Sequence, residues 1–212
     1  MPHYKQYKTT DLTQIVGFVR AYPFANIVKN DPNQDIPSIV SAPIIHAAEE
    51  GQMEFHIAKS NPAFDNFYAG GHVVAIFNGP NAHISPSWYL DRFKEGDRSK
   101  TAPTWNYTQV KIEGEIQPMS DDMLAAHLDR LVTHFEDTVP EGWAFNEISP
   151  DILEKWSQFI QGFTLSVQNA EGLFKLSQEQ SPIDQRNVIK ELNERDKGYD
   201  KNLANFMSKS LE

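Results

Sequence analysis

The sequence predicts an α+β protein built on a mostly antiparallel β-barrel with peripheral helices. Short apolar segments rich in β-branched residues are spread along the whole chain of 212 residues, and turn-forming residues separate them. Segments with helical periodicity are inserted between these strands, which is typical of an α+β domain. Because no internal repeat or low-complexity linker interrupts the chain, we expect residues 1–212 to form a single domain with a helical C-terminal tail.

The N-terminal half is expected to begin with one helix and to continue mainly as strands. Apolar residues at helical spacing predict a helix from Thr10 to Tyr22, which Pro23 ends. Strands are predicted over residues 24–28, 38–45, 52–57 and 72–77. A short helix is expected to start near Asn61-Pro62, and a loop from Asn78 to Tyr89 is expected to follow the strand over residues 72–77.

The C-terminal half is expected to combine long strands with amphipathic helices. A strand is predicted over residues 104–116, with apolar residues on one face near its end. Ser120 and Ser149-Pro150 each open a helix with an apolar stripe. Two strands, residues 163–167 and 173–176, are expected around a turn at Glu171-Gly172, and the chain is helical from residue 183 onward.

Composition and charge exclude several classes of function. The chain has no cysteine, so disulfides, thiolate metal sites, iron–sulfur clusters and cysteine nucleophiles are excluded. A net charge of −10 opposes general attraction to nucleic-acid phosphates. The N-terminus does not resemble a signal peptide, and no segment approaches the ~20 apolar residues that a membrane span needs. We therefore expect a cytoplasmic protein without membrane contact.

The segment from Asn78 to Tyr89 contains the highest density of residues that could contact a ligand. Its prolines and aromatic residues can form a rigid wall, and His83, Ser85 and Ser87 offer hydrogen bonds to a planar polar ligand. The alternative is a structured loop whose aromatic residues complete the core, and the residues alone leave both interpretations open.

Lys59, Ser60 and Asn61 follow a predicted strand and precede a predicted helix. One ammonium, one hydroxyl and free backbone N–H groups at a helix start suit a phosphate group. The alternative is a solvated lysine beside an ordinary helix cap. This segment is the second candidate for ligand binding.

Two further candidates lie at the ends of strands. Trp105 and Tyr107 share one face of their strand and could stack on an aromatic ring, or they could only cover the end of the barrel. The cationic Lys175 could reach an anionic ligand or face water. His127 and His134, a heptad apart, are better explained by a solvated helix face than by a zinc site, and we expect no metal.

The ordered motifs resemble the PaiB-type family of FMN-binding negative transcriptional regulators, a branch of the FMN-binding split barrels. The resemblance covers almost the whole chain and includes the following segments: Tyr22-Pro23-Phe24-Ala25, His56-Ile57-Ala58-Lys59-Ser60-Asn61-Pro62, Ala75-Ile76-Phe77-Asn78-Gly79-Pro80, Ile84-Ser85-Pro86-Ser87-Trp88-Tyr89, Pro103-Thr104-Trp105-Asn106-Tyr107 and Phe174-Lys175-Leu176-Ser177-Gln178. The strings SPSWY and PTWNY, in this order, are the most specific.

The resemblance implies a split β-barrel homodimer that binds one FMN per subunit near the dimer interface. Carried onto this chain, it implies that Lys59, Ser60 and Asn61 bind the flavin phosphate. It also implies a group of flavin-pocket or interface residues: Ser85, Trp88, Trp105, Asn106, Tyr107, Lys175 and Ser177. Three positions depart from the family pattern, because Ser41 and Lys111 stand where histidine is expected and Gln180 replaces a basic residue. If those histidines hold the cofactor or substrate, binding is weakened or altered here.

Two functional hypotheses follow from the sequence. The first is a flavin-binding protein, a candidate flavin-dependent oxidoreductase in which FMN supplies the redox chemistry and no catalytic side chain is identified. The alternative is a transcriptional regulator, a repressor acting through DNA or partner binding, with flavin absent or only structural. A local basic face around Arg92, Lys94, Arg98 and Lys100 would serve DNA binding, although the net charge does not support it.

Overall fold

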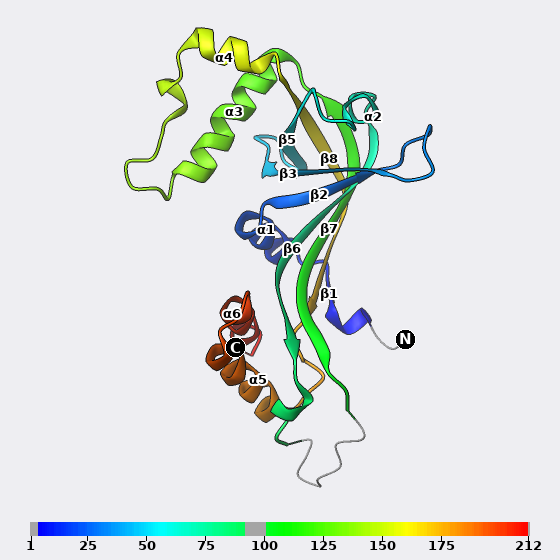
Figure 1. Ribbon diagram of the computed structural model, residues 1–212, viewed down its shortest axis with the longest axis vertical. Coiled ribbons are helices and arrows are strands. Elements are labelled where there is room, and N and C mark those ends of the chain that lie inside the picture. Colours follow the sequence, from blue (N-terminus) through cyan, green and yellow to red (C-terminus); the bar gives the residue numbers. More distant parts are fainter. Residues whose placement is uncertain (1–3, 92–100, 212) are drawn as a thin grey trace. The chain divides into compact units, whose positions relative to one another are not determined.

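The computed structural model describes residues 4–91 and 101–211 (Figure 1). Its strands are β1 (Lys8–Thr9), β2 (Phe24–Lys29), β3 (Ser38–Pro43), β4 (Ile45–His46), β5 (Gln52–Ala58), β6 (Gly71–Ile84), β7 (Thr104–Pro118) and β8 (Ile160–Lys175). Its α-helices are α1 (Leu12–Ala21), α2 (Phe64–Tyr68), α3 (Asp121–Glu136), α4 (Pro150–Ser157), α5 (Pro182–Arg195) and α6 (Asp200–Lys209). Short 3-10 helices are η1 (Tyr4–Tyr7), η2 (Pro86–Trp88) and η4 (Phe145–Glu147).

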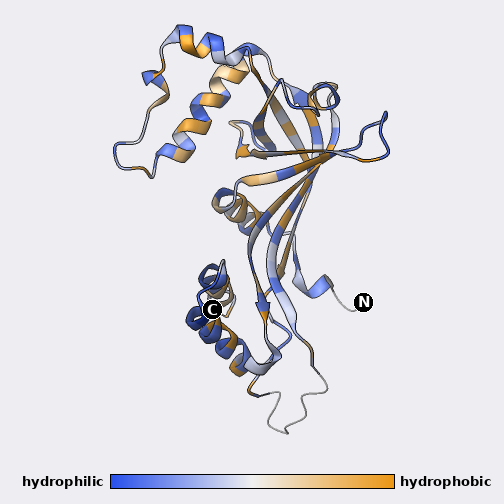
Figure 2. Cartoon of the chain, viewed as in Figure 1, coloured by the Kyte–Doolittle hydropathy of each residue, from blue (hydrophilic) through white to orange (hydrophobic). Residues whose placement is uncertain are grey.

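The strands form one sheet in the order β3-β2-β6-β7-β8-β5-β4, and β1 pairs with β8. The ladders β1–β8, β2–β3, β2–β6, β4–β5 and β5–β8 are antiparallel. The α+β class with an antiparallel sheet is therefore as the sequence predicts. Hydrophobic and hydrophilic residues alternate along the strands (Figure 2), because successive side chains point to opposite faces of a sheet.

The chain divides into two compact units. Unit 1 comprises residues 1–15, 78–110 and 171–212, and unit 2 comprises residues 16–77 and 111–170. The long strands β6, β7 and β8 each contribute residues to both units. The expected basic face around Arg92, Lys94, Arg98 and Lys100 lies outside the described residues.

Unit 2 has a core of aromatic and aliphatic side chains. Alternate residues of β5 point into it, and the Phe55 ring stacks on Phe163 of β8 with 5.3 Å between ring centroids. Phe67 of α2 meets the same Phe163 ring edge-on at 6.3 Å. Side chains of this size contribute about 1.5–3 kcal/mol each when fully buried, so this stack anchors β5 and α2 to β8.

Unit 1 is built around the helical C-terminal tail, which the sequence predicts correctly. Leu176, Val188, Leu192, Leu203 and Met207 share one buried cluster that joins the end of β8 to α5 and α6. The two helices lie side by side in Figure 1. Their apolar faces thus cover each other and the strand ends of the same unit.

The loop predicted from Asn78 and the turn predicted at Glu171-Gly172 are wrong at these positions, because the strands continue through them. β6 runs through Asn78-Gly79-Pro80-Asn81, where the Pro80 carbonyl accepts a hydrogen bond from Thr108 Oγ1 at 3.0 Å. The β2–β6 ladder ends at Phe77, so the proline lies beyond it, where a missing N–H is tolerated. β8 likewise runs through Glu171-Gly172. A Cβ at Gly172 would lie 2.7 Å from Thr9 Cγ2, so this glycine permits the close approach of β1.

Two smaller boundaries also differ from expectation. The strand predicted over residues 38–45 is divided into β3 and β4. The helix expected at Asn61-Pro62 begins at Phe64, because Asn61 Oδ1 accepts a hydrogen bond from the Ala63 N–H at 2.9 Å and forms a turn before the helix.

Candidate functional site

The residues expected to bind phosphate lie in unit 2, directly after β5. The Lys59 N–H donates to the Phe159 carbonyl at 2.8 Å, which fixes the backbone where the strand ends. The side chains of Lys59 and Ser60 are exposed and make no hydrogen bond or ion pair within residues 4–91 and 101–211. Asn61 uses its Oδ1 in the turn with Ala63. One ammonium and one hydroxyl are therefore available to an anion.

In unit 1, Lys175 at the end of β8 holds the start of β7. Its ammonium donates to Thr104 Oγ1 and, at 2.8 Å, to the Trp105 carbonyl. Burial lowers the pKa of Lys175, and the nearby Glu179 opposes this shift. The Trp105 side chain is 54% exposed, and Tyr107 on the same strand face is half-buried. These two rings present an aromatic surface, whereas the lysine already has internal partners.

Asn106 and Ser177 meet on the buried side of the same region. Asn106 Nδ2 donates to Ser177 Oγ at 2.8 Å and contacts Met207 Sδ at 3.7 Å. Ser177 has φ 61°, a left-handed conformation that favours glycine, and the hydrogen bond from Asn106 holds it there. Among the described residues Asn106 Oδ1 has no hydrogen-bond partner. This pair therefore stabilises the turn that leads from β8 to α5.

Ser85 and Trp88 belong to the 3-10 helix that follows β6. Ser85 Oγ caps it by accepting a hydrogen bond from the Ser87 N–H at 3.2 Å. The Trp88 ring lies against the Arg195 guanidinium, whose central carbon is 4.9 Å from the ring centroid. Arg195 also donates two hydrogen bonds to Asp200, at 2.7 and 2.6 Å. One face of Trp88 is thus covered from within unit 1.

The ten predicted residues therefore fall into two groups. Within unit 1 the structure brings Lys175 to Trp105 and Asn106 to Ser177. Lys59, Ser60 and Asn61 adjoin one another in unit 2. Asn106 and Ser177 are fully buried, so the candidate contact surfaces are Trp105 with Tyr107 in unit 1 and Lys59 with Ser60 in unit 2.

The sequence-based interpretation missed a buried chain of polar groups in unit 2. Arg130 of α3 donates to both carboxylate oxygens of Glu54, at 2.7 and 2.8 Å. Glu54 Oε2 lies 3.2 Å from His127 Nδ1, and His127 Nε2 lies 3.1 Å from His56 Nδ1. His127 is 0% exposed, so its assignment to a solvated helix face is wrong, although His134 is exposed as expected.

Burial dominates the titration of this polar chain. It lowers the pKa of His127 to about 4, with a further lowering by the neighbouring His56 that the Glu54 carboxylate only partly offsets. Burial also lowers the pKa of His56. Both imidazoles are therefore neutral near pH 7.

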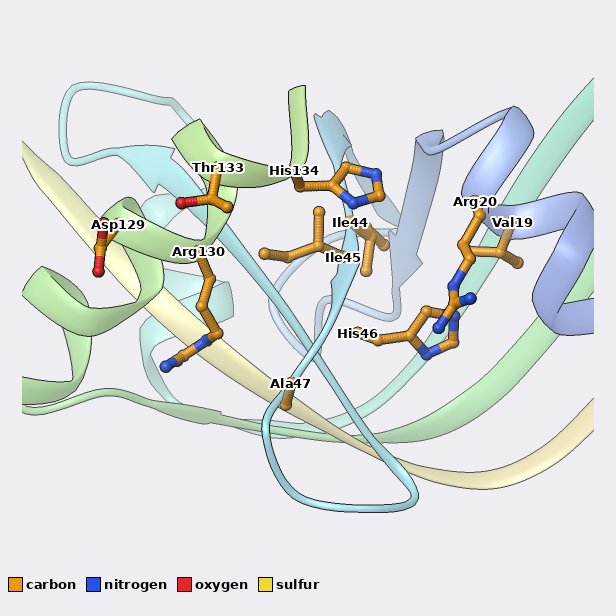
Figure 3. Close-up of a pocket in the computed structure, with 10 residues that line it drawn as sticks. All are labelled: Val19, Arg20, Ile44, Ile45, His46, Ala47, Asp129, Arg130, Thr133 and His134. Carbon is orange, nitrogen blue, oxygen red and sulfur yellow. The ribbon is translucent and has the colours of Figure 1, made fainter. Parts of the chain in front are cut away.

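A second feature of unit 2 is a cavity of about 530 Å³ between α1, β4 and α3 (Figure 3). Figure 3 shows the Arg20 guanidinium beside the His46 ring, with His134 on the facing helix. Burial, then Arg20 and His134, lower the pKa of His46. The lining includes two arginines, Arg20 and Arg130, and one carboxylate, Asp129. Two isoleucines, Ile44 and Ile45, supply apolar surface. None of the ten predicted site residues lines it.

Within residues 4–91 and 101–211, no cluster of three or more His, Cys, Asp or Glu side chains is arranged to hold a metal ion. In the same part of the chain, no helix combines the length and the hydrophobicity needed to cross a membrane.

Comparisons with known proteins identify the family to which this chain belongs. The family model described as "Putative FMN-binding domain" matches residues 1–169. A relative from Bacillus subtilis (strain 168), named protease synthase and sporulation protein PAI 2, is 28% identical over 208 residues, which cover 98% of this chain and 97% of that protein. Together these two matches confirm the resemblance inferred from the motifs.

Solved structures with a similar fold have little sequence in common with this chain. The FAD and heme binding protein from Mycobacterium smegmatis has a TM-score of 0.58 at 12% identity, covering 80% of this chain and 73% of that one. The flavocytochrome Anf3 from Azotobacter vinelandii has a TM-score of 0.57 at 13% identity, covering 82% and 72%. These likenesses concern the fold alone, and they confirm the α+β split-barrel class.

Proposed function

Because this chain belongs to the FMN-binding domain family matched over residues 1–169, we propose that it binds FMN at a homodimer interface and uses it for redox chemistry. In this proposal residues 1–212 act as one flavin-binding domain with a helical tail. The observation that carries the proposal is the pair of exposed side chains, Lys59 and Ser60, that have no partner within the described residues.

Lys59 and Ser60 fit a phosphate group by their chemistry. A lysine ammonium and a serine hydroxyl supply charge-assisted and neutral hydrogen bonds to phosphate oxygens. Neither group has to break an internal bond to do so, and the Lys59 N–H fixes the backbone by its bond to Phe159. The net charge of −10 makes such a local cation necessary, because the chain as a whole repels a dianion.

Trp105 and Tyr107 are proposed to contact the flavin ring or the second subunit. The Trp105 indole is 54% exposed and meets the His83 ring edge-on at 6.3 Å, and an exposed indole gains stability when an aromatic ring stacks on it. Lys175 holds the backbone beneath Trp105, and Asn106 with Ser177 secures the same strand from its buried side. These three residues support the contact surface. Ser85, which caps η2, and Trp88 within η2 are proposed as further contacts to the flavin or the second subunit.

When bound, FMN supplies hydride or single-electron transfer, which the side chains of a chain without cysteine do not provide. In this proposal Lys59 and Ser60 bind the phosphate of the cofactor. No general acid or base is assigned.

The comparison of FMN with riboflavin tests the phosphate assignment, because riboflavin lacks the phosphate. Titration of the purified protein with each flavin, followed by flavin fluorescence, should show tighter binding of FMN. Lys59→Ala should weaken FMN binding by about tenfold or more, the loss of one charged hydrogen bond, and leave riboflavin unchanged. Lys209→Ala, an exposed lysine at the end of α6, is the matched control. Equal effects on both flavins would refute the phosphate role, and no binding at micromolar FMN would refute the function.

The ring surface and the dimer are tested separately. Trp105→Leu should weaken FMN and riboflavin equally, because stacking does not involve the phosphate. Sedimentation equilibrium should give the mass of a dimer, and NADH or NADPH should bleach the absorbance of the bound flavin if the site is redox-active. A monomer that binds FMN would contradict the interface, and a flavin inert to reductants would contradict the redox role.

A further inference from the structure

The polar chain of Arg130, Glu54, His127 and His56 forms because one strand face meets one helix face. Glu54 and His56 are two residues apart in β5, so their side chains leave the same face of the sheet, opposite Phe55. His127 and Arg130 are three apart in α3 and lie on one side of the helix. The sheet residue paired with His56 is Gly162, where an added Cβ would lie 3.2 Å from Leu124 of α3. The missing side chain lets the helix pack closely over this face.

The hydrogen bonds fix the position of every proton along the chain. A carboxylate held by the Arg130 fork only accepts, so His127 Nδ1 carries the hydrogen that it donates to Glu54. The neutral His127 then has a bare Nε2, which accepts from His56 Nδ1–H. His56 Nε2 is left with a lone pair, and it has no hydrogen-bond partner within the described residues.

His56 also lines a cavity of about 420 Å³ whose other walls are apolar. Leu128 and Val132 of α3 form one wall, and Trp143, Trp156 and Phe159 belong to the segments around α4. The last two side chains are 56% and 61% exposed, an unusual amount for large apolar groups in one place. The volume is within the range of small-molecule pockets, about 300–1,000 Å³.

We propose that this cavity binds a neutral aromatic molecule with one O–H or N–H donor, such as a substituted phenol, and that His56 Nε2 accepts that hydrogen bond. The aromatic walls supply the affinity for the ring, and the polar chain supplies the specificity. A neutral imidazole with a fixed lone pair favours a donor and disfavours an anion, because a carboxylate would bring a second set of lone pairs to it. The site lies within unit 2, and the inference does not depend on flavin binding.

Calorimetric titration of the full-length protein with para-ethylphenol, para-ethylanisole and para-ethylbenzoate tests the proposal. We expect saturable binding of the phenol, about tenfold weaker binding of the anisole, which lacks the donor, and no measurable binding of the anionic benzoate. The result should be the same with and without FMN. Absence of saturable phenol binding, or equal affinities for phenol and anisole, would overturn the proposal.

Three variants separate the hydrogen bond from the shape of the cavity. His56→Phe should abolish the preference for the phenol while the anisole still binds, an outcome that loss of folding cannot produce. Trp156→Ala should weaken both ligands by the same factor. Phe135→Ala, an exposed aromatic of α3 outside the cavity, is the matched control and should change neither. If His56→Phe leaves the preference intact, another group accepts the hydrogen bond and the proposal is wrong.

Hemin is a necessary second probe, because a bare imidazole nitrogen can also bind iron. The proposal predicts that hemin titration leaves the Soret band of free hemin unchanged. An imidazole-ligated spectrum that His56→Phe removes would assign the lone pair to a metal and refute a phenol-type ligand.

Discussion

Acid should destabilise this protein through His127, and the structure gives the size of the effect. Burial lowers the pKa of this imidazole from 6.5 to about 4 in the folded chain, and one pKa unit corresponds to about 1.4 kcal/mol. Between pH 6.5 and pH 4 the unfolded chain therefore binds a proton that the folded chain excludes. The free energy of unfolding falls as the pH is lowered through this window, by about 3 kcal/mol in total from His127.

The groups around His127 support this sign. The Glu54 carboxylate from β5 favours a charged imidazole, but burial, His56 and the Arg130 guanidinium oppose it, and the net shift is downward. His56 contributes a further loss of the same sign, because burial lowers its pKa as well. Well above pH 6.5 the imidazole of His127 is neutral in both states, so its contribution to stability is constant there.

Urea unfolding monitored by tryptophan fluorescence at several pH values between 4 and 7 measures the slope. His127→Gln keeps a donor toward Glu54 and removes the titration, so its free energy of unfolding should vary less with pH, by up to about 1.4 kcal/mol per pH unit. His134→Gln, an exposed histidine on the same helix, should keep the wild-type slope. If His127→Gln and the wild-type protein have the same slope, the buried neutral imidazole is the wrong explanation.

Two further predictions concern close packing and a buried ion pair, and urea unfolding checks both. Gly114→Ala should cost about 2–3 kcal/mol, because its Cβ would lie 2.1 Å from a backbone carbonyl oxygen of β8. Gly17→Ala, in open space on α1, should instead stabilise by about 0.5–1 kcal/mol, and the opposite ranking would contradict the packing. Asp200→Asn should cost about 2–3 kcal/mol, since Asp200 is 1% exposed and bonded twice to Arg195. Asp196→Asn, an exposed control, should change stability by less than about 0.5 kcal/mol.

The fold was predictable wherever local signals and tertiary packing agree. Ser120 accepts a hydrogen bond at the start of α3, and α4 begins at Pro150 directly after Ser149, both as predicted. The apolar periodicity of α1 and β7 likewise identifies both elements. Gly79-Pro80 and Gly172 misled the interpretation because glycine and proline usually mark turns. In this fold both positions lie within strands. Pro80 lies beyond the β2–β6 ladder, and the missing side chain of Gly172 leaves space for Thr9 of β1.

The polar chain could not be predicted for a different reason. Glu54 and His127 are 73 residues apart, and no local pattern brings a strand face to a particular helix face. One signal was nevertheless present. His127 falls between Leu124 and Leu128 on the apolar stripe of α3. A titratable residue inside an apolar stripe requires a hydrogen-bond partner when it is buried. For His127 that partner is Glu54 on the facing strand β5.

Some polar side chains of this protein form their hydrogen bonds within the fold, whereas others keep a donor or acceptor without an internal partner. The first kind are structural, and the second kind are candidates for ligand binding. Asn106 and Ser177 bind each other and hold the turn into α5, and Trp88 is covered by Arg195. Replacing such residues disturbs the fold first and a ligand only indirectly. Lys59 and the Nε2 atom of His56 have no internal partner among the described residues, although the backbone of one and the Nδ1 of the other are fixed. A group that is held in place on one side and open on the other loses little entropy when it binds, and for this physical reason both proposals are based on these groups.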